Sequence, residues 1–317
     1  MPSVLAHYIF LKEGDKNLPS IANIGAQGPD PFFFNVIALK NDTNNKRVTS
    51  VGHFMHNVDP FVTFEYCMNY IMNADEKEKP ILLAYFKGML AHYSLDSVAH
   101  PYIFYKSGFV TDDESKAQDF FYAHASIETM IDANLKETFK CKTSAGKAIK
   151  AKKKELKIVS KMLYHYLNDV WHLDYVEEDS FYKAARRMHL GYSIIYSHTG
   201  FRKSIYRKLM KVSLINVLST PKLKDVPPLD FLNLKHEPRY DCVTGDNEKT
   251  TNFYEIFDEG IEKFHKFEAV VDGILAGTST VEDMRPITRL IDHDGKRVGS
   301  SMRYYKLIWD ELEKDKK

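Results

Sequence analysis

The segment His92-Tyr-Ser-Leu-Asp96-Ser-Val-Ala-His100, followed directly by Pro101, decides the fold. His92, Asp96 and His100 stand four residues apart, so on a helix they share one side and drift by about 40° at each step. The apolar residues before them also recur at helical spacing, at Ile81, Leu82, Tyr85, Phe86, Met89 and Leu90. We therefore predict a helix over residues 77–100 that ends near Pro101.

A second histidine–carboxylate pair, His124-Ala-Ser-Ile-Glu128, repeats this four-residue spacing. One such pair often forms only a hydrogen bond. Several imidazoles and carboxylates inside otherwise apolar helices are harder to explain, because burying polar groups without partners is costly. Two such helices that face each other could hold more than one metal ion. Nitrogen and oxygen ligands without cysteine favour zinc over iron or manganese.

Asp30 and two histidines are further candidate ligands upstream. Pro29 and Pro31 flank Asp30 and stiffen the backbone there, which suits a metal ligand. Asp30 could also be the N-cap of a helix that starts at Pro31, and the two interpretations are compatible. His53 and His56 stand three residues apart and could share a helix face, although a lone histidine there is more often a hydrogen-bonded core residue.

Helical periodicity continues through most of the chain, and strand signals are sparse. We predict further helices in five regions: one capped by Asp112 or Asp113 that runs through Phe120 to Ile131, a lysine-dense one over about 143–165, one over 180–197 that ends at Gly200, one from the capping box Asn252-Phe-Tyr-Glu255 to about Leu275, and a charged one over 301–316. Residues 214–251 are rich in proline and turn residues and are expected to form a long loop. The sequence thus predicts an all-α fold, a single multi-helix bundle domain over residues 1–317, with C-terminal helices in 252–316.

The composition limits the class of protein. The 317 residues are 44% hydrophobic with a net charge of +1, so the chain can bury a core, and its charge does not favour broad binding to nucleic acid or membranes. Cys67, Cys141 and Cys242 are few and far apart, which predicts neither disulfides nor a cysteine zinc site and fits a reducing compartment. The sequence has no run of about 18 apolar residues, so no transmembrane helix is expected. The N-terminus does not read as a signal peptide, so we expect a cytoplasmic chain that starts at Met1, or at Pro2 once Met1 is removed.

The motifs are specific when they are taken together. They are Ala6-His7-Tyr8, Gly25-Ala-Gln-Gly-Pro-Asp30-Pro-Phe-Phe-Phe34, Met55-His56, His92–Tyr102 and His124–Glu128. In this combination the chain resembles the bacterial zinc-dependent phospholipase C family, whose fold is shared with the fungal single-strand-specific zinc nucleases. The resemblance covers roughly residues 1–132, and beyond them only the general helical character is similar. It implies a bundle of the phospholipase C and zinc nuclease type, with three zinc ions in an all-α cleft.

The resemblance also implies a set of ligands for each ion. Carried over to this chain, one zinc is held by Asp30, His56, His92 and Asp96, a second by His100, His124 and Glu128, and a third by His7, by Asp96 as a bridging carboxylate and by the amino nitrogen and carbonyl of the N-terminal residue, Pro2. In the family the N-terminal ligand is a tryptophan of a processed secreted chain, and this chain has no tryptophan at that position. Because of this departure, the expected number of zinc ions per chain is two or three. His56 is preferred to His53 because His56-Asn-Val-Asp59 resembles the setting of the ligand in the nucleases.

The implied function is hydrolysis of a phosphodiester, with a phospholipid head group as one candidate substrate. In this mechanism a zinc-bound hydroxide attacks, and Asp30 orients the water as a general base in addition to ligating. Two alternatives stay open: a nuclease-like phosphodiesterase that acts on single strands of nucleic acid, and a zinc-binding protein without turnover. The sequence does not predict the oligomeric state. Asp292-His-Asp-Gly295 is expected to form a turn, and seven histidines are expected to be structural or exposed: His165, His172, His189, His198, His236, His265 and His293.

Overall fold

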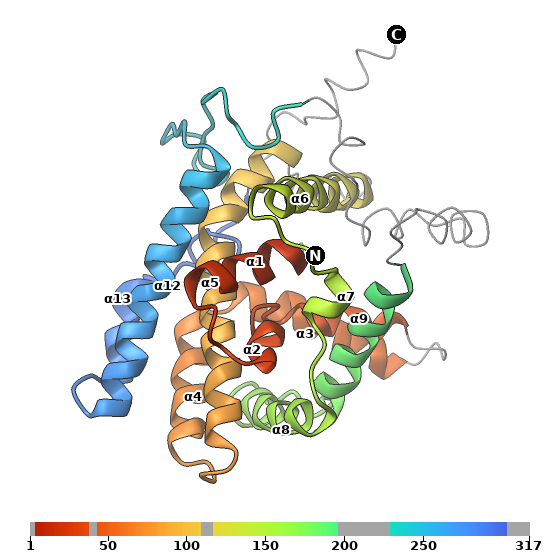
Figure 1. The fold of residues 1–317 in the computed structure, drawn as a ribbon, viewed down its shortest axis with the longest axis vertical. Helices are drawn as coiled ribbons and strands as arrows, with labels where there is room; N and C mark the ends of the chain where they lie inside the picture. The colour runs from red at the N-terminus through yellow and green to blue at the C-terminus, as the bar shows by residue number, and fades with distance from the viewer. Residues whose placement is uncertain (1–3, 38–42, 109–116, 196–228, 303–317) are drawn as a thin grey trace.

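The computed structural model describes residues 4–37, 43–108, 117–195 and 229–302. Helices joined by turns and loops make up these ranges (Figure 1). They are, in order, α1 (Val4–Gly14), α2 (Ser20–Gly25), the 3₁₀ helix η1 (Asp30–Ile37), α3 (Thr43–Asn57), α4 (Pro60–Met72), α5 (Lys79–Ser107), α6 (Ala117–Thr138), α7 (Ala145–Ala148), α8 (Lys153–Asp169), α9 (Ser180–Ile195), α12 (Phe253–Ala276), the 3₁₀ helix η4 (Val281–Met284) and α13 (Arg285–Thr288). No β-strand occurs in these ranges, where β-type pairing is limited to two isolated bridges, Arg239 with Lys249 and Ile291 with Arg297. The predicted all-α class is therefore confirmed for this part of the chain, while the bundle type and the single domain stay predictions.

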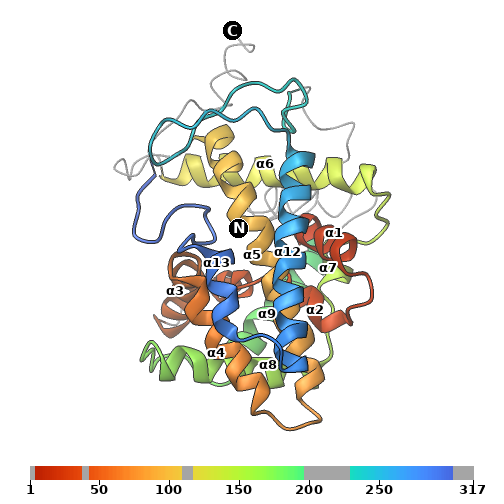
Figure 2. The ribbon, with the colours of Figure 1, turned by 90° about the vertical axis from the view of Figure 1, so that its left-hand side faces the viewer.

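Helix α5 forms the centre of the fold. It packs against α2, α12, α6, α1, α4 and α8, and α12 runs beside it in both views (Figures 1 and 2). Apolar residues occupy more than one stripe of this helix, so it is buried around nearly its whole circumference, for example at Leu82, Tyr85, Phe86 and Leu90. The histidines of α5 and Asp96 are therefore enclosed by other elements.

The end of α5 differs from the prediction, since the helix passes through Pro101 and continues to Ser107. Proline lacks the N–H that would bond the carbonyl of Ser97, at a cost of about 3 kcal/mol. The next turn offsets this cost, because Tyr102 and Ile103 are buried and each such side chain contributes about 1.5–3 kcal/mol. The packing of the residues after Pro101 therefore outweighs the tendency of proline to end the helix.

The bounds predicted for the lysine-dense helix, about 143–165, are wrong. One turn, α7, is followed by a break, and α8 begins only at Lys153. The Ser144 hydroxyl caps α7 by accepting a hydrogen bond from the Lys147 amide, and Ile149 just after the turn is buried. This cap and the buried Ile149 fix a separate turn that packs against α1 and α9.

Other predicted elements are confirmed where the structure describes them. Helix α9 begins at Ser180, and α12 begins with the predicted capping box, in which the Asn252 and Glu255 side chains each accept a hydrogen bond from the other residue's amide. Residues 229–251 contain no helix, as expected for this part of the long loop. Several predictions about the fold lie outside the described residues: Asp112, Asp113, Gly200, the loop before residue 229 and the helical tail from residue 303.

Helices α2 and α5 touch main chain to main chain. A Cβ atom on Gly25 would lie 2.1 Å from the carbonyl oxygen of Tyr85, and one on Gly88 would lie 2.2 Å from that of Ala22. Both distances are well inside van der Waals contact, so only glycine fits at this crossing. The crossing brings Ala26, just after α2, into hydrogen-bond distance of the His92 side chain.

The main hydrophobic cluster connects the two ends of the described chain. It extends from Val4 in α1 to Met284 in η4, so the N-terminal motifs and the C-terminal helices share a core. The three cysteines are free, as the sequence predicts. Within the described ranges, no helix is both long and apolar enough to cross a membrane.

Candidate metal centre

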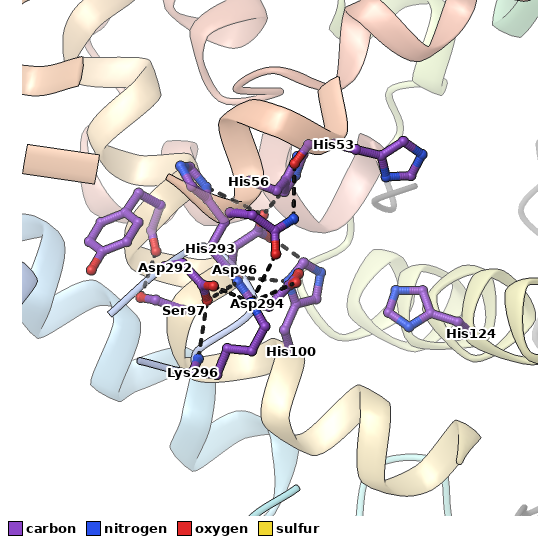
Figure 3. A network of polar contacts seen from close by, with 12 residues as sticks. His53, His56, Asp96, Ser97, His100, His124, Asp292, His293, Asp294 and Lys296 are labelled. Carbon is purple, nitrogen blue, oxygen red and sulfur yellow. Dashed lines mark hydrogen bonds and ion pairs between the residues drawn. The ribbon is translucent and has the colours of Figure 1, made fainter. Parts of the chain in front are cut away.

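The predicted ligands come together around α5, and Figure 3 labels four of them: His56, Asp96, His100 and His124. His7 comes from α1, Asp30 starts η1, His56 lies near the end of α3, and α6 supplies two more side chains. The gathered side chains expose at most 12% of their surface. The members described by the structure are His7, Asp30, His56, His92, Asp96, His100, His124 and Glu128, joined by His293 from the loop after α13.

Four of these side chains form what we call the His56 group: His56, His92, Asp96 and His293. One potential ligand atom from each lies within 4.8 Å of the other three. Asp96 Oδ2 is 2.9 Å from His92 Nε2, 3.8 Å from His56 Nε2 and 3.9 Å from His293 Nδ1. Three imidazole nitrogens and a carboxylate oxygen thus converge on one point.

A second set, which we call the His124 group, contains His100, His124 and Glu128. Its ligand atoms also lie within 4.8 Å of one another. Glu128 Oε1 is 3.0 Å from His124 Nε2 and 3.7 Å from His100 Nε2, so α6 presents its pair toward α5. These are the three side chains that the resemblance assigns to one zinc ion.

Asp96 lies between the two groups. Its Oδ2 belongs to the His56 group, whereas its Oδ1 is 3.1 Å from His7 Nε2 and 3.9 Å from His100 Nε2. A carboxylate whose two oxygens face different sets of imidazoles has the arrangement that a bridging ligand requires. The third predicted site would also need Pro2, which lies outside the described residues.

Asp30 is buried beside the His56 group without being one of its four members. Its Oδ1 is 3.3 Å from His56 Nε2. Among the described residues neither Asp30 oxygen has a hydrogen-bond partner, so the N-cap hydrogen bond considered from the sequence is absent. The catalytic role of Asp30 stays a prediction. His53 is exposed, packs its ring against Phe33 and points away from the cluster (Figure 3), so the structure places His56 in the group and His53 outside it.

Backbone carbonyls orient three of the imidazole rings. Nδ1 of His56 donates to Gly52 O at 2.7 Å, Nδ1 of His92 donates to Ala26 O at 3.2 Å, and Nδ1 of His100 donates to His293 O at 2.8 Å. A carbonyl only accepts, so Nδ1 carries the hydrogen in each ring. In the neutral ring Nε2 then presents a lone pair to the carboxylates, as in histidines that bind metals.

Burial and the carboxylates act in opposite directions on the imidazole pKa values. Burial lowers the pKa of His92 and of His124, and that of His293 to about 3. Burial also disfavours the charged form of His56 and His100, but nearby carboxylates outweigh it and raise the pKa of His56, and that of His100 to about 10. The cluster therefore mixes neutral and cationic imidazoles.

The two acidic members respond to the same charges. Burial alone would raise their pKa values, but His92 and His100 hold the pKa of Asp96 well below its usual range, and His124 lowers the pKa of Glu128. Both side chains are therefore carboxylates at neutral pH.

His92 supplies the test of whether a cation fits. Its ring is neutral and its hydrogen is on Nδ1, so the Nε2 lone pair lies 2.9 Å from a carboxylate oxygen. Two electron-pair donors at that distance repel unless a proton or a metal cation lies between them. Within the described ranges, several buried atoms of the cluster lack a hydrogen-bond partner: His7 Nδ1, both Asp30 oxygens, His92 Nε2, Asp96 Oδ2, His124 Nδ1, Glu128 Oε2 and His293 Nδ1. The donor set therefore fits a divalent metal ion.

His293 and Asp132 are the residues that the sequence did not reveal. His293 was expected to be structural or exposed but is a buried member of the His56 group. Its only signal was a histidine flanked by Asp292 and Asp294 in a turn. Asp132 is one turn after Glu128 on α6, and its carboxylate accepts hydrogen bonds from the amides of Leu5 and Ala6, which fixes the start of α1 beside the cluster.

The other histidines lie away from the cluster, as expected. The rings of His165 and His189 are half-buried, and His172, His236 and His265 are exposed; His198 lies outside the described residues. Comparison of the chain with protein-family models, with curated proteins and with solved structures finds no match. The resemblance to the phospholipase C family therefore stays a prediction from the motifs in residues 1–132.

Proposed function

We propose that this chain is a zinc-dependent phosphodiester hydrolase of the phospholipase C type, with two or three zinc ions in the cluster. The observation that carries the proposal is the convergence of the His56, His92 and His293 ring nitrogens on Asp96 Oδ2 inside the protein, because a metal cation would satisfy these donor atoms together. The His56 group and the His124 group would each hold an ion, and Asp96 would bridge toward His7.

The side chains of the cluster have distinct roles in this proposal. Zinc, when bound, lowers the pKa of a coordinated water from about 16 toward 7 and stabilises the charge that develops on phosphate oxygens. The carbonyls of Gly52 and Ala26 hold the His56 and His92 rings in the ligating tautomer. Asp30 has two carboxylate oxygens without hydrogen bonds, and it accepts the proton of the attacking water.

The burial of the cluster favours the runner-up, a zinc-binding protein without turnover. Among the cavities of the described residues, the one lined by His7, Asp96 and Glu128 has a volume of about 20 Å³. That volume suits a single water and is too small for a phosphodiester. Hydrolysis therefore requires an opening movement, whereas storage or structural binding of zinc does not.

Metal analysis followed by activity measurements tests the proposal. The purified chain should contain two to three zinc ions and should hydrolyse at least one of three substrates: a phosphocholine ester, bis-nitrophenyl phosphate or single-stranded nucleic acid. His92→Ala should remove metal and activity together, whereas His265→Ala, at an exposed position on α12, should change neither. Fewer than one zinc in a folded chain contradicts the metal centre. Full metal without activity on any substrate supports the protein without turnover.

A further inference from the structure

The loop after α13 is fixed on the cluster by its own turn. Ile291 and Arg297 pair in an isolated bridge, and Asp292 Oδ1 accepts hydrogen bonds from the amides of Asp294 and Lys296. The Lys296 ammonium pairs with Asp292 and also donates to Asn57 Oδ1, at 2.9 Å, at the end of α3. The loop is thus held in one conformation and tied to the helix that carries His56.

The main chain of His293 connects the two ligand groups. Its amide donates to the carbonyl of His56 at 3.2 Å, and its carbonyl accepts from His100 Nδ1 at 2.8 Å. The Tyr93 hydroxyl donates to Ile291 O at 2.8 Å, which holds the start of the loop on α5. These contacts fix the main chain of the loop and place the His293 ring beside that of His56 (Figure 3), with ring centroids 5.2 Å from His56 and 5.3 Å from His92.

The ring nitrogen that faces the cluster is buried and lacks a partner. His293 exposes 7% of its surface, and within the described ranges its Nδ1 has no hydrogen bond. Ligand atoms of a tetrahedral zinc lie about 3.3 Å apart, given bonds of about 2.0 Å. The three imidazole nitrogens lie 2.9, 3.8 and 3.9 Å from Asp96 Oδ2, distances that bracket this separation.

We propose that His293 is the fourth protein ligand of the ion held by His56, His92 and Asp96, which closes that site to water. This inference rests on the proposed metal centre and assigns different tasks to its two groups. A zinc with four protein ligands is closed, as in structural sites, whereas three ligands leave a position for water, as in catalytic sites. Among the described residues the His124 group supplies three ligands, so it keeps the open position.

The free space near the two groups agrees with this assignment. The cavity that His293 lines, beside Gly28 and Met55, has a volume of about 10 Å³. The cavity beside Asp96 and Glu128 has about 20 Å³. A water needs roughly 10–15 Å³ and two or more polar partners. Mostly apolar side chains line the first cavity, whereas His7, Asp96 and Glu128 line the second, so the second suits a water better.

On this inference the reactive water lies on the Glu128 side of Asp96, away from Asp30 beside His56, so Asp30 is not its proton acceptor. Asp30→Asn should then keep its rate of hydrolysis, and a loss of rate with full zinc content would count against closure of the His56 site.

Cobalt titration of the metal-free chain tests the inference, because four-coordinate Co²⁺ absorbs visible light more strongly than Co²⁺ with more ligands. His293→Ala should weaken binding of one ion by at least about 100-fold, beyond the 10–100-fold effect of an outer-shell group, and should remove one component of the absorption. Binding by the other ion should persist. His265→Ala is the matched control at an exposed histidine and should titrate like the wild type.

The outcomes separate this inference from the proposed function. A wild-type chain that binds no Co²⁺ contradicts the metal centre itself. A wild-type chain that binds, together with a His293→Ala chain of the same affinity and spectrum, overturns only the role of His293. If His293→Ala does not fold, His293→Gln fills the same space for the same titration. X-ray absorption of Glu128→Gln with one zinc equivalent adds a direct count: three imidazoles are expected, and two would overturn the inference.

Discussion

The ring of His100 donates a hydrogen bond to the main-chain carbonyl of His293, 2.8 Å away and 193 residues farther along the chain. His293 thus acts on the His124 group through its backbone and on the His56 group through its ring. Substitution of the side chain removes only the second contact. The two effects can therefore be separated experimentally.

Asp96 should be required for both ions, because its two oxygens face different groups. Asp96→Asn is expected to lower the metal content to less than half of the wild-type value, whereas Glu128→Gln should lose only the ion of the His124 group. Elemental analysis after dialysis measures both. Asp272→Asn removes an exposed carboxylate that pairs with Lys87 and should keep full metal content. Normal metal content in Asp96→Asn would refute the bridging arrangement.

Asp30→Asn should separate proton transfer from metal binding. Asp30 is outside the four converging atoms of the His56 group, so the variant should retain its zinc. If Asp30 is the general base of the proposed function, its loss lowers the rate of hydrolysis by roughly 10²–10⁴-fold, whereas the rate persists if His293 closes the His56 site. Parallel measurement of zinc content and of kcat on bis-nitrophenyl phosphate separates these two outcomes. A variant that loses zinc as well would identify Asp30 as a ligand, as the phospholipase C resemblance implies.

Lys263 should make stability depend on pH at alkaline values. Burial lowers its pKa from 10.5 to about 7, while its ammonium donates to Ser97 Oγ and lies 4.2 Å from the centre of the Tyr93 ring. Between these two pKa values the unfolded chain binds more protons than the folded chain, so stability rises with pH there. The destabilisation that comes from burying the charged Lys263 is fully present below pH 7 and disappears toward pH 10.5.

The variant Lys263→Met removes this group and should flatten that part of the pH profile. Relative to the wild type, its free energy of unfolding should therefore fall as the pH rises from 7 to 10. Urea unfolding at several pH values measures the difference. Lys154→Met, at an exposed lysine on α8 that is not among the charges acting on Lys263, is the control and should leave the profile unchanged. Parallel profiles for Lys263→Met and the wild type contradict the shifted pKa.

Gly88→Ala should destabilise the fold and weaken metal binding together. The added methyl group would lie 2.2 Å from Ala22 O, and overpacking of this kind costs about 1–3 kcal/mol. Moving α2 also moves Ala26, whose carbonyl orients His92. Gly273→Ala is the control, because its methyl group meets the Ser279 side chain near the end of α12. Thermal unfolding and zinc affinity should both change for Gly88→Ala, and a change in neither would contradict the role of the crossing.

The parts of the site carried by helices could be predicted, because helical spacing encodes which side chains share a face. His92, Asp96 and His100 needed only their four-residue spacing, and His124 with Glu128 repeated it. His293 could not be found in this way, because a loop has no period and its position depends on contacts with α3 and α5. The end of α5 was missed for a related reason, since burial after Pro101 is a tertiary effect.

The contact between Gly25 and Gly88 also bears on how freely this sequence can change. Side chains that line a site can be exchanged one at a time, and the neighbouring residues adjust. The His92 ring is oriented through the contact between the backbones of α2 and α5. This contact cannot be changed in small steps, because a single added carbon atom on either glycine already collides. Substitutions should therefore accumulate around His92 in many places before they reach these two positions. Apart from the proposed ligands, a library of random variants selected for retained zinc should show the two glycines as the least tolerant residues of α2 and α5.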